Sequence, residues 1–124
     1  MINEKLKKIK LVITDVDGVL TDGLLHYDAN GEAIKSFHVR DGLGVKMLMD
    51  AGIQVAVLSG RDSAILRKRI RDLGIKLFFL GKLEKESACL DLMKQAGVTV
   101  EQTAYIGDDS VDLPAFATCG LSFA

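Results

Sequence analysis

Short runs of aliphatic residues alternate along this 124-residue chain with segments of helical periodicity, and this alternation restricts the fold more than any other feature. Continuous apolar runs of this kind are typical of strands that are buried on both faces. We predict strands at 11–14, 54–58, 77–80, 103–106 and 120–124. We predict helices at 41–51, 63–73, 84–95 and 113–118. The alternation predicts an α/β fold with a doubly wound, mostly parallel five-stranded sheet.

Apolar spacing within the predicted helices indicates which side of each helix faces the core. In the first helix these residues are Leu43, Met47, Leu48 and Ala51. In the second they are Ile65, Leu66, Ile70 and Leu73, and the basic residues Arg67, Lys68, Arg69 and Arg71 are predicted to face solvent. Cys89 and Cys119 lack the spacing of a zinc site and are interpreted as small core residues.

The loops after four of the predicted strands carry charged or hydroxyl side chains. These residues are Asp15, Asp17, Ser59, Lys82, Lys85, Asp108 and Asp109. In open α/β sheets, ligands bind at the carboxyl ends of the strands, where all of these loops lie. Two crowded carboxylates repel each other unless a cation lies beside them. The coincidence of independent loops favours a functional site over a solvated loop that contains two aspartates.

The chemistry of this set suits a magnesium-dependent phosphohydrolase. Mg²⁺ prefers carboxylate and phosphate oxygens, and a lysine, a serine and the N–H groups around Gly18 and Gly60 suit a phosphate dianion. A carboxylate beside the phosphoryl group can act as a nucleophile. A second carboxylic acid can protonate the leaving oxygen, an effect worth about 10²–10⁴-fold in rate.

Four segments resemble, in chain order, the four motifs of the haloacid dehalogenase superfamily of phosphatases. They are 15–21 (DVDGVLT), 59–61 (SGR), Lys85 and 107–112 (GDDSVD). Within the superfamily, the Asn30-Gly31 hairpin and the segment 37–42 (FHVRDG) are similar to the branch that acts on 3-deoxy-D-manno-octulosonate 8-phosphate (KDO 8-phosphate). The resemblance covers nearly the whole chain from Ile9 onward.

The resemblance implies a role for each matching residue. Asp15 is expected to be the nucleophile and Asp17 the general acid/base. Mg²⁺ is expected to be held by Asp15, the Asp17 main-chain carbonyl and Asp108, with Asp109 close by or acting through water. Contacts with the phosphate or sugar acid are expected from Ser59, Gly60, Arg61, Lys82 and Lys85. For Arg61 and Lys82, solvated surface charges are the alternative, and Asp112, His26, His38 and Arg40 are expected to have structural roles.

A β-hairpin insert is predicted at about 24–39, because Asn30-Gly31 lies between strand-like residues. Both of its faces carry apolar groups, and a two-stranded hairpin is marginal in water, so something must cover it. The interval between Asp17 and Ser59 is too short for a cap domain. Capless relatives form tetramers through this hairpin, so the resemblance implies a homotetramer in which a neighbouring subunit shields the substrate.

Charge and hydropathy exclude other classes of partner. Sixteen basic residues against seventeen acidic ones give a formal net charge of −1, which implies neither a nucleic acid nor an anionic membrane. No apolar run approaches a membrane span and no signal-type region follows Met1, so we expect a cytoplasmic protein. We expect one domain over 1–124, truncated relative to relatives that continue through a further helix and tail.

Three other functions remain open at this stage. A phosphatase of a sialic-acid-type 9-phosphate would use the same chemistry. A receiver domain of a response regulator has a similar fold, but it places its phospho-acceptor Asp after the third strand, where this chain has Leu80-Gly81. A non-catalytic phospho-binding module would keep the fold without turnover.

Overall fold

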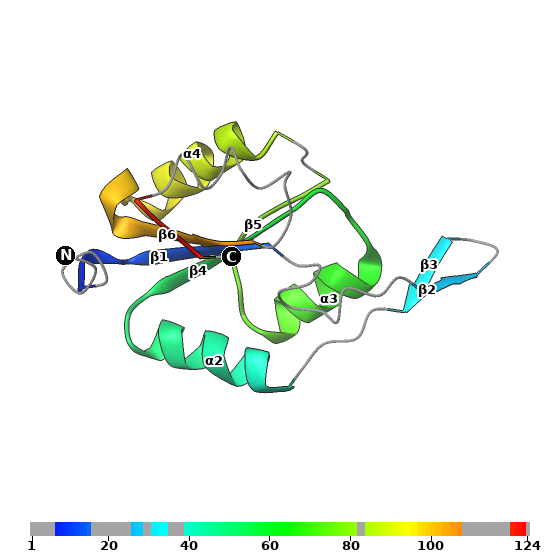
Figure 1. The fold of residues 1–124 in the computed structure, drawn as a ribbon. Coiled ribbons are helices and arrows are strands. Elements are labelled where there is room, and N and C mark those ends of the chain that lie inside the picture. Colours follow the sequence, from blue (N-terminus) through cyan, green and yellow to red (C-terminus); the bar gives the residue numbers. More distant parts are fainter. Residues whose placement is uncertain are drawn as a thin grey trace.

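A parallel sheet of five strands forms the centre of the molecule in a computed structural model, which describes residues 7–15, 26–28, 31–34, 39–81, 84–107 and 120–123 (Figure 1). Its strands are β1 (Leu11–Thr14), β4 (Gln54–Ser59), β5 (Leu77–Leu80), β6 (Thr103–Ile106) and β7 (Leu121–Phe123). They lie in the order β5-β4-β1-β6-β7, and each neighbouring pair is parallel. The α/β fold and the parallel sheet predicted from the sequence are confirmed.

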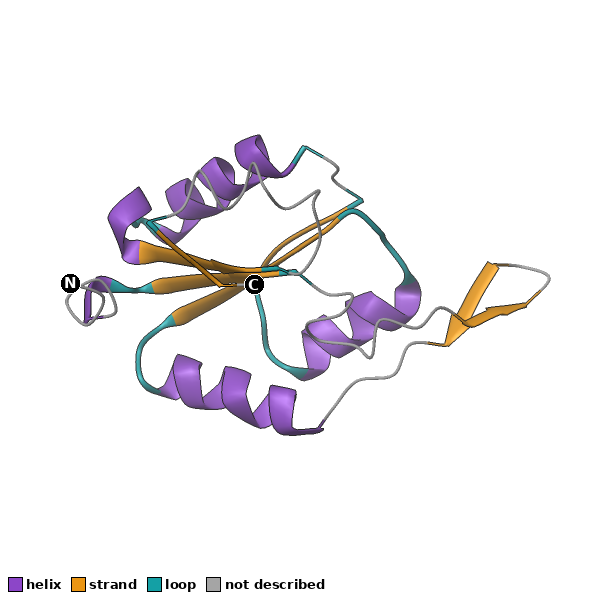
Figure 2. Ribbon diagram, in the orientation of Figure 1, coloured by secondary structure: helices purple, strands orange, loops and turns teal. Residues whose placement is uncertain are grey.

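Helices cover both faces of the sheet. Among the described residues, the helical elements that connect the strands are α2 (Val39–Asp50), α3 (Ala64–Asp72), α4 (Lys85–Ala96) and the 3-10 turn η1 (Val100–Gln102). Figure 2 shows α2 and α3 on one side of the sheet and α4 on the other. The predicted helix at 113–118 lies outside the described residues. Within the described part of the chain, no helix has the length and apolarity needed to cross a membrane.

Two hydrophobic clusters, one on each face, hold these layers together. Residues of β4 alternate between them: Ala56 and Leu58 pack in the cluster that contains Leu92 of α4. Val55 and Val57 pack in the other, which includes residues of α2 and α3. Because each fully buried aliphatic side chain stabilises the fold by about 1.5–3 kcal/mol, this two-sided burial fixes the strands in place. Cys89 lies in the first cluster, as predicted, and Cys119 lies outside the described residues.

The predicted core face of α2 is confirmed at Leu48, which packs against the second cluster, and is wrong at Leu43, Met47 and Ala51. Leu43 and Met47 are 60% and 63% exposed, whereas Gly42 and Val45 are buried. Apolar residues occur on more than one side of this helix, so their spacing could not identify the inner face. Packing against α3 selects Gly42, because a Cβ there would lie 2.8 Å from Nη2 of Arg69.

The face of α3 agrees with the prediction in its apolar residues and differs in one basic residue. Leu66 and Ile70 are buried, as is Leu73 directly after the helix. Arg67, Lys68 and Arg71 are exposed, but Arg69 is only half-exposed because it lies against α2. The basic cluster is therefore a solvated face, except for Arg69, which lies in the contact between α2 and α3.

The hairpin forms a separate two-stranded sheet of β2 (His26–Asp28) and β3 (Gly31–Ile34). Its strands are antiparallel, and Gly31 pairs with Asp28. Figure 1 shows the hairpin projecting away from the five-stranded sheet. The prediction that its second strand continues to Val39 is wrong, because Val39 begins α2.

Candidate active site

Asp15 lies at the carboxyl end of β1, the central strand, and its backbone is fixed from two sides. Its N–H donates a hydrogen bond of 2.8 Å to the carbonyl of Ile106 in β6. Its own carbonyl accepts one of 2.8 Å from the Thr14 hydroxyl. The Asp15 side chain is 9% exposed. The sheet therefore presents a nearly buried carboxylate at the edge where ligands of such folds bind.

Lys85 begins α4 and points its ammonium group at Asp15. The distance from its Nζ to Asp15 Oδ1 is 3.4 Å, and the Lys85 side chain is only 3% exposed. Lysine is almost never buried to this extent unless it is paired. Because removing two charges from water costs several kcal/mol per ion, such a pair is weak evidence for stability and better evidence for a site.

Ser59 ends β4, the strand next to β1. Thr14 of β1 pairs with Val57, two residues before Ser59, so Ser59 reaches the same edge of the sheet as Asp15. The serine is buried, and its Oγ accepts a hydrogen bond of 3.1 Å from the N–H of Arg61. Its hydroxyl proton can donate to an anion at this edge.

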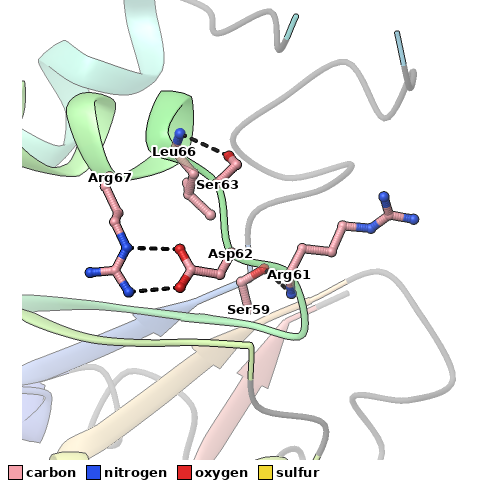
Figure 3. A network of polar contacts seen from close by, with 6 residues as sticks. All are labelled: Ser59, Arg61, Asp62, Ser63, Leu66 and Arg67. Carbon is pink, nitrogen blue, oxygen red and sulfur yellow. Dashed lines mark hydrogen bonds and ion pairs between the residues drawn. The ribbon is translucent and has the colours of Figure 1, made fainter. Parts of the chain in front are cut away.

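The loop that follows Ser59 carries Gly60 and Arg61, the other residues predicted there. Arg61 is exposed, and its carbonyl accepts a hydrogen bond of 3.2 Å from the N–H of Gly81, directly after β5. Figure 3 shows the Arg61 side chain pointing away from Asp62 and Arg67, its neighbours in the loop and in α3. An exposed guanidinium in this position suits contact with an anion that approaches from solvent.

Sequence reasoning missed an ion pair beside this loop. The Arg67 guanidinium donates to both carboxylate oxygens of Asp62, over 2.8 and 2.7 Å. This hydrogen bonding lowers the pKa of Asp62 from its ordinary value and raises that of Arg67. Ser63 caps α3, with its Oγ accepting from the N–H of Leu66. A serine just before a helical pattern is a known start signal and could have been used, whereas the spacing of Asp62 and Arg67 matches no standard helical pair.

Several predicted site residues lie outside the described residues, so their roles stay predictions. They are Asp17, Lys82, Asp108, Asp109, Asp112 and His38. Gly107, the last described residue before Asp108, is buried at the end of β6. Among the described residues, no three His, Cys, Asp or Glu side chains could hold a metal ion together. Asp15 is the one predicted metal ligand with a described side chain, and its carboxylate is a hard oxygen donor that fits Mg²⁺.

Comparison with known proteins agrees with the family resemblance predicted from the sequence. A family model of haloacid dehalogenase-like hydrolases matches residues 38–120. The 3-deoxy-D-manno-octulosonate 8-phosphate phosphatase of Haemophilus influenzae is 88% identical over 121 residues, which are 98% of this chain and 67% of that protein. The Escherichia coli K12 enzyme of the same name is 41% identical, over 97% of this chain and 64% of that protein. The chain thus spans about two thirds of the length of these curated relatives.

Solved structures of relatives have the same fold. The cobalt-bound phosphatase from Haemophilus influenzae superposes with a TM-score of 0.96 at 88% identity, over 97% of this chain and 70% of that one. The enzyme from Moraxella catarrhalis, solved with magnesium, phosphate and KDO, gives a TM-score of 0.90 at 42% identity, over 96% of this chain and 68% of that one. The predicted resemblance is confirmed: this chain belongs to the haloacid dehalogenase-like hydrolase family.

Proposed function

We propose that this chain is the catalytic core of a magnesium-dependent phosphatase that hydrolyses KDO 8-phosphate to KDO and inorganic phosphate. The observation that carries the proposal is the buried contact between Asp15 and Lys85 at the carboxyl edge of the sheet. The names of the relatives support the substrate, and the relative solved with magnesium, phosphate and KDO supports the metal. Because the matching family is a hydrolase family, the receiver-domain alternative is not retained.

Asp15 is the nucleophile in this mechanism. Its carboxylate oxygen attacks phosphorus, the bond to the sugar oxygen breaks, and an aspartyl phosphate forms. Asp17 donates a proton to the departing sugar oxygen. Water then attacks the aspartyl phosphate while Asp17 takes up its proton, which releases phosphate and restores Asp15.

Lys85 and Ser59 bind and neutralise the phosphoryl group. The Lys85 ammonium is already 3.4 Å from Asp15, so it lies where the negative charge of the phosphoryl group arrives. The Ser59 hydroxyl and the Gly60 N–H are further donors. Arg61 and Lys82 contact the phosphate or the sugar acid.

Mg²⁺ supplies charge neutralisation and alignment of the phosphoryl group. The residues that would hold it are Asp15, the main-chain carbonyl of Asp17 and Asp108, with Asp109 close by. All four directly follow β1 or β6 in the sequence, and these adjacent strands pair Thr14 with Ile106.

We also propose that the protein is a cytoplasmic homotetramer assembled through the hairpin, and that residues 1–124 act as one domain. The support for assembly is the hairpin itself, which projects away from the sheet (Figure 1) and is too small to be stable without cover. Sedimentation velocity of the chain tests this. A tetramer that dissociates when 24–39 are replaced by a short linker is expected, and a monomer with full activity would contradict it.

Phosphate release from a panel of sugar phosphates, with and without Mg²⁺, tests the function. We expect release that requires Mg²⁺ and is fastest with KDO 8-phosphate. Faster release from a sialic acid 9-phosphate would change the substrate and keep the reaction. Release from no substrate would contradict the phosphatase assignment.

A further inference from the structure

The loop from Ser59 to Ser63 is held by contacts that the proposed catalytic roles do not use. The N–H of Arg61 donates to the Ser59 hydroxyl, and the Arg61 carbonyl accepts from the N–H of Gly81. At the other end, the Ser63 hydroxyl accepts from the N–H of Leu66 and caps α3. The loop is therefore tied both to the end of β5 and to the start of α3.

The strongest of these ties is the contact between Asp62 and Arg67. Nε and Nη2 of Arg67 lie 2.8 and 2.7 Å from the two carboxylate oxygens of Asp62. Two parallel hydrogen bonds from a planar guanidinium fix the orientation of the carboxylate as well as its position. The same guanidinium lies 5.9 Å from the ring centroid of Phe78, so the contact is also anchored on β5.

Arg61 is the residue whose orientation depends on this contact. It is joined to Asp62 by one peptide unit, which is rigid and planar. In Figure 3 the carboxylate of Asp62 turns toward α3, while the side chain of Arg61 points the opposite way. The N–H and the carbonyl of Arg61 are also hydrogen-bonded, to Ser59 and Gly81. Together with these bonds, the contact that holds Asp62 against α3 restricts the direction in which the Arg61 side chain points.

We propose that Asp62 and Arg67 form a positioning pair, which sets the direction of the Arg61 guanidinium so that it binds the anionic group of the substrate. This inference rests on the proposed function, because that function brings the phosphate or carboxylate that Arg61 binds to this edge of the sheet. The pair touches no reacting atom. Its loss therefore weakens substrate binding, which raises KM, and leaves the chemical step unchanged.

Steady-state kinetics of the 124-residue chain with KDO 8-phosphate tests the pair. Arg67→Met keeps the apolar stem and removes the guanidinium, and we expect it to raise KM by about 3- to 10-fold, at the low end of coupling between contacting residues, with kcat nearly unchanged. Arg67→Lys keeps the charge without the planar guanidinium, so its KM should lie between those of the parent and of Arg67→Met. Lys68→Met is the matched control, because Lys68 is an exposed cation on the same helix, and it should leave KM unchanged.

A double-mutant cycle separates positioning from a general effect on the fold. In an Arg61→Ala background, Arg67→Met should raise KM no further, because the side chain it positions is absent. An equal rise in KM in both backgrounds, or a fall in kcat alone, would overturn the proposal.

Hydrogen exchange at the Gly81 amide gives a readout that needs no turnover. This N–H donates to the Arg61 carbonyl, so it reports directly on the loop. We expect faster exchange in Arg67→Met and unchanged exchange in Lys68→Met. Unchanged exchange in Arg67→Met would overturn the positioning pair, whereas a parent chain without phosphatase activity would count against the proposed function instead.

Discussion

Two ion pairs lie near the carboxyl edge of the sheet, and they differ in burial and in length. The pair of Asp62 and Arg67 is short, at 2.7 Å, but its side chains are 41% and 49% exposed. The pair of Asp15 and Lys85 is longer, at 3.4 Å, and its side chains are 9% and 3% exposed. The shorter contact is screened by water, whereas the longer one has replaced much of the water around two charges.

Burial, rather than length, distinguishes the pair that can do chemistry. A charge held at a water-poor edge interacts strongly with any charge that arrives there, which is what phosphoryl transfer requires. An exposed bidentate pair can fix a loop at little cost to the fold. We therefore propose catalysis for Asp15 and Lys85 and positioning for Asp62 and Arg67, and four substitutions or titrations test that division.

Replacing Asp15, the proposed nucleophile, should have the largest effect. We expect Asp15→Asn to lower kcat by about 10⁴-fold or more, the scale observed when a nucleophile is removed from a cooperating set of groups. Circular dichroism should show the parent's secondary structure. Activity near that of the parent, in a correctly folded variant, would remove Asp15 from its assigned role.

Removing the other partner should affect both activity and stability. We expect Lys85→Met to lower kcat/KM by about 10²–10³-fold, because a preorganised positive charge is lost from the site. It should also lower the free energy of unfolding by about 3 kcal/mol, since the Asp15 carboxylate is left buried without its cation. Urea titration measures the second effect.

A double variant sharpens the comparison. Asp15→Asn combined with Lys85→Met removes both charges, so it should be more stable to urea than Lys85→Met alone. If the double variant is less stable than either single one, Asp15 and Lys85 stabilise the fold independently of each other, and their burial is not a mark of a paired functional site.

The smallest effect is expected for the exposed pair, as a change in the pKa of Asp62 when Arg67 is replaced. Its hydrogen bonds from Arg67 hold the pKa of Asp62 below the ordinary value of 3.8. Stability from this pair is therefore fully present above pH 3.8 and is lost as the pH falls through the lowered pKa of the folded state. Carboxyl NMR of the parent and of Arg67→Met should show the Asp62 midpoint moving up toward 3.8 in the variant. No difference would mean that the contact does not persist in solution.

The elements of the sheet could be predicted from the sequence because a strand buried on both faces has few alternatives. The run 11–14 and the acidic residue after it are observed as β1 and Asp15. The core face of α2 could be predicted only in part: Leu48 packs against the core as predicted, but Gly42 is buried there because of its close approach to Arg69 of α3. The predicted end of the hairpin's second strand was wrong, because Val39 is the first residue of α2.

In the site, too, the features set by neighbouring residues could be predicted, whereas the contacts set by tertiary packing could not. That Asp15 and Lys85 lie toward one edge of the sheet follows from the parallel direction of the strands, which the sequence predicts. Their contact spans 70 positions and their depth of burial depends on the packing of α4, so neither could be read from spacing. The contact of Asp62 and Arg67 joins a loop to the helix after it, and no sequence rule for helical pairs covers that geometry.

Trapping the phosphorylated intermediate is the most direct test of the central claim. The chain is mixed with Mg²⁺ and KDO 8-phosphate, quenched in acid within one turnover and digested, and the phosphorylated peptide is located by mass spectrometry. We expect phosphate on Asp15 in the parent and none in Asp15→Asn. Phosphate release without any label on Asp15, or a label that persists in Asp15→Asn, would contradict it.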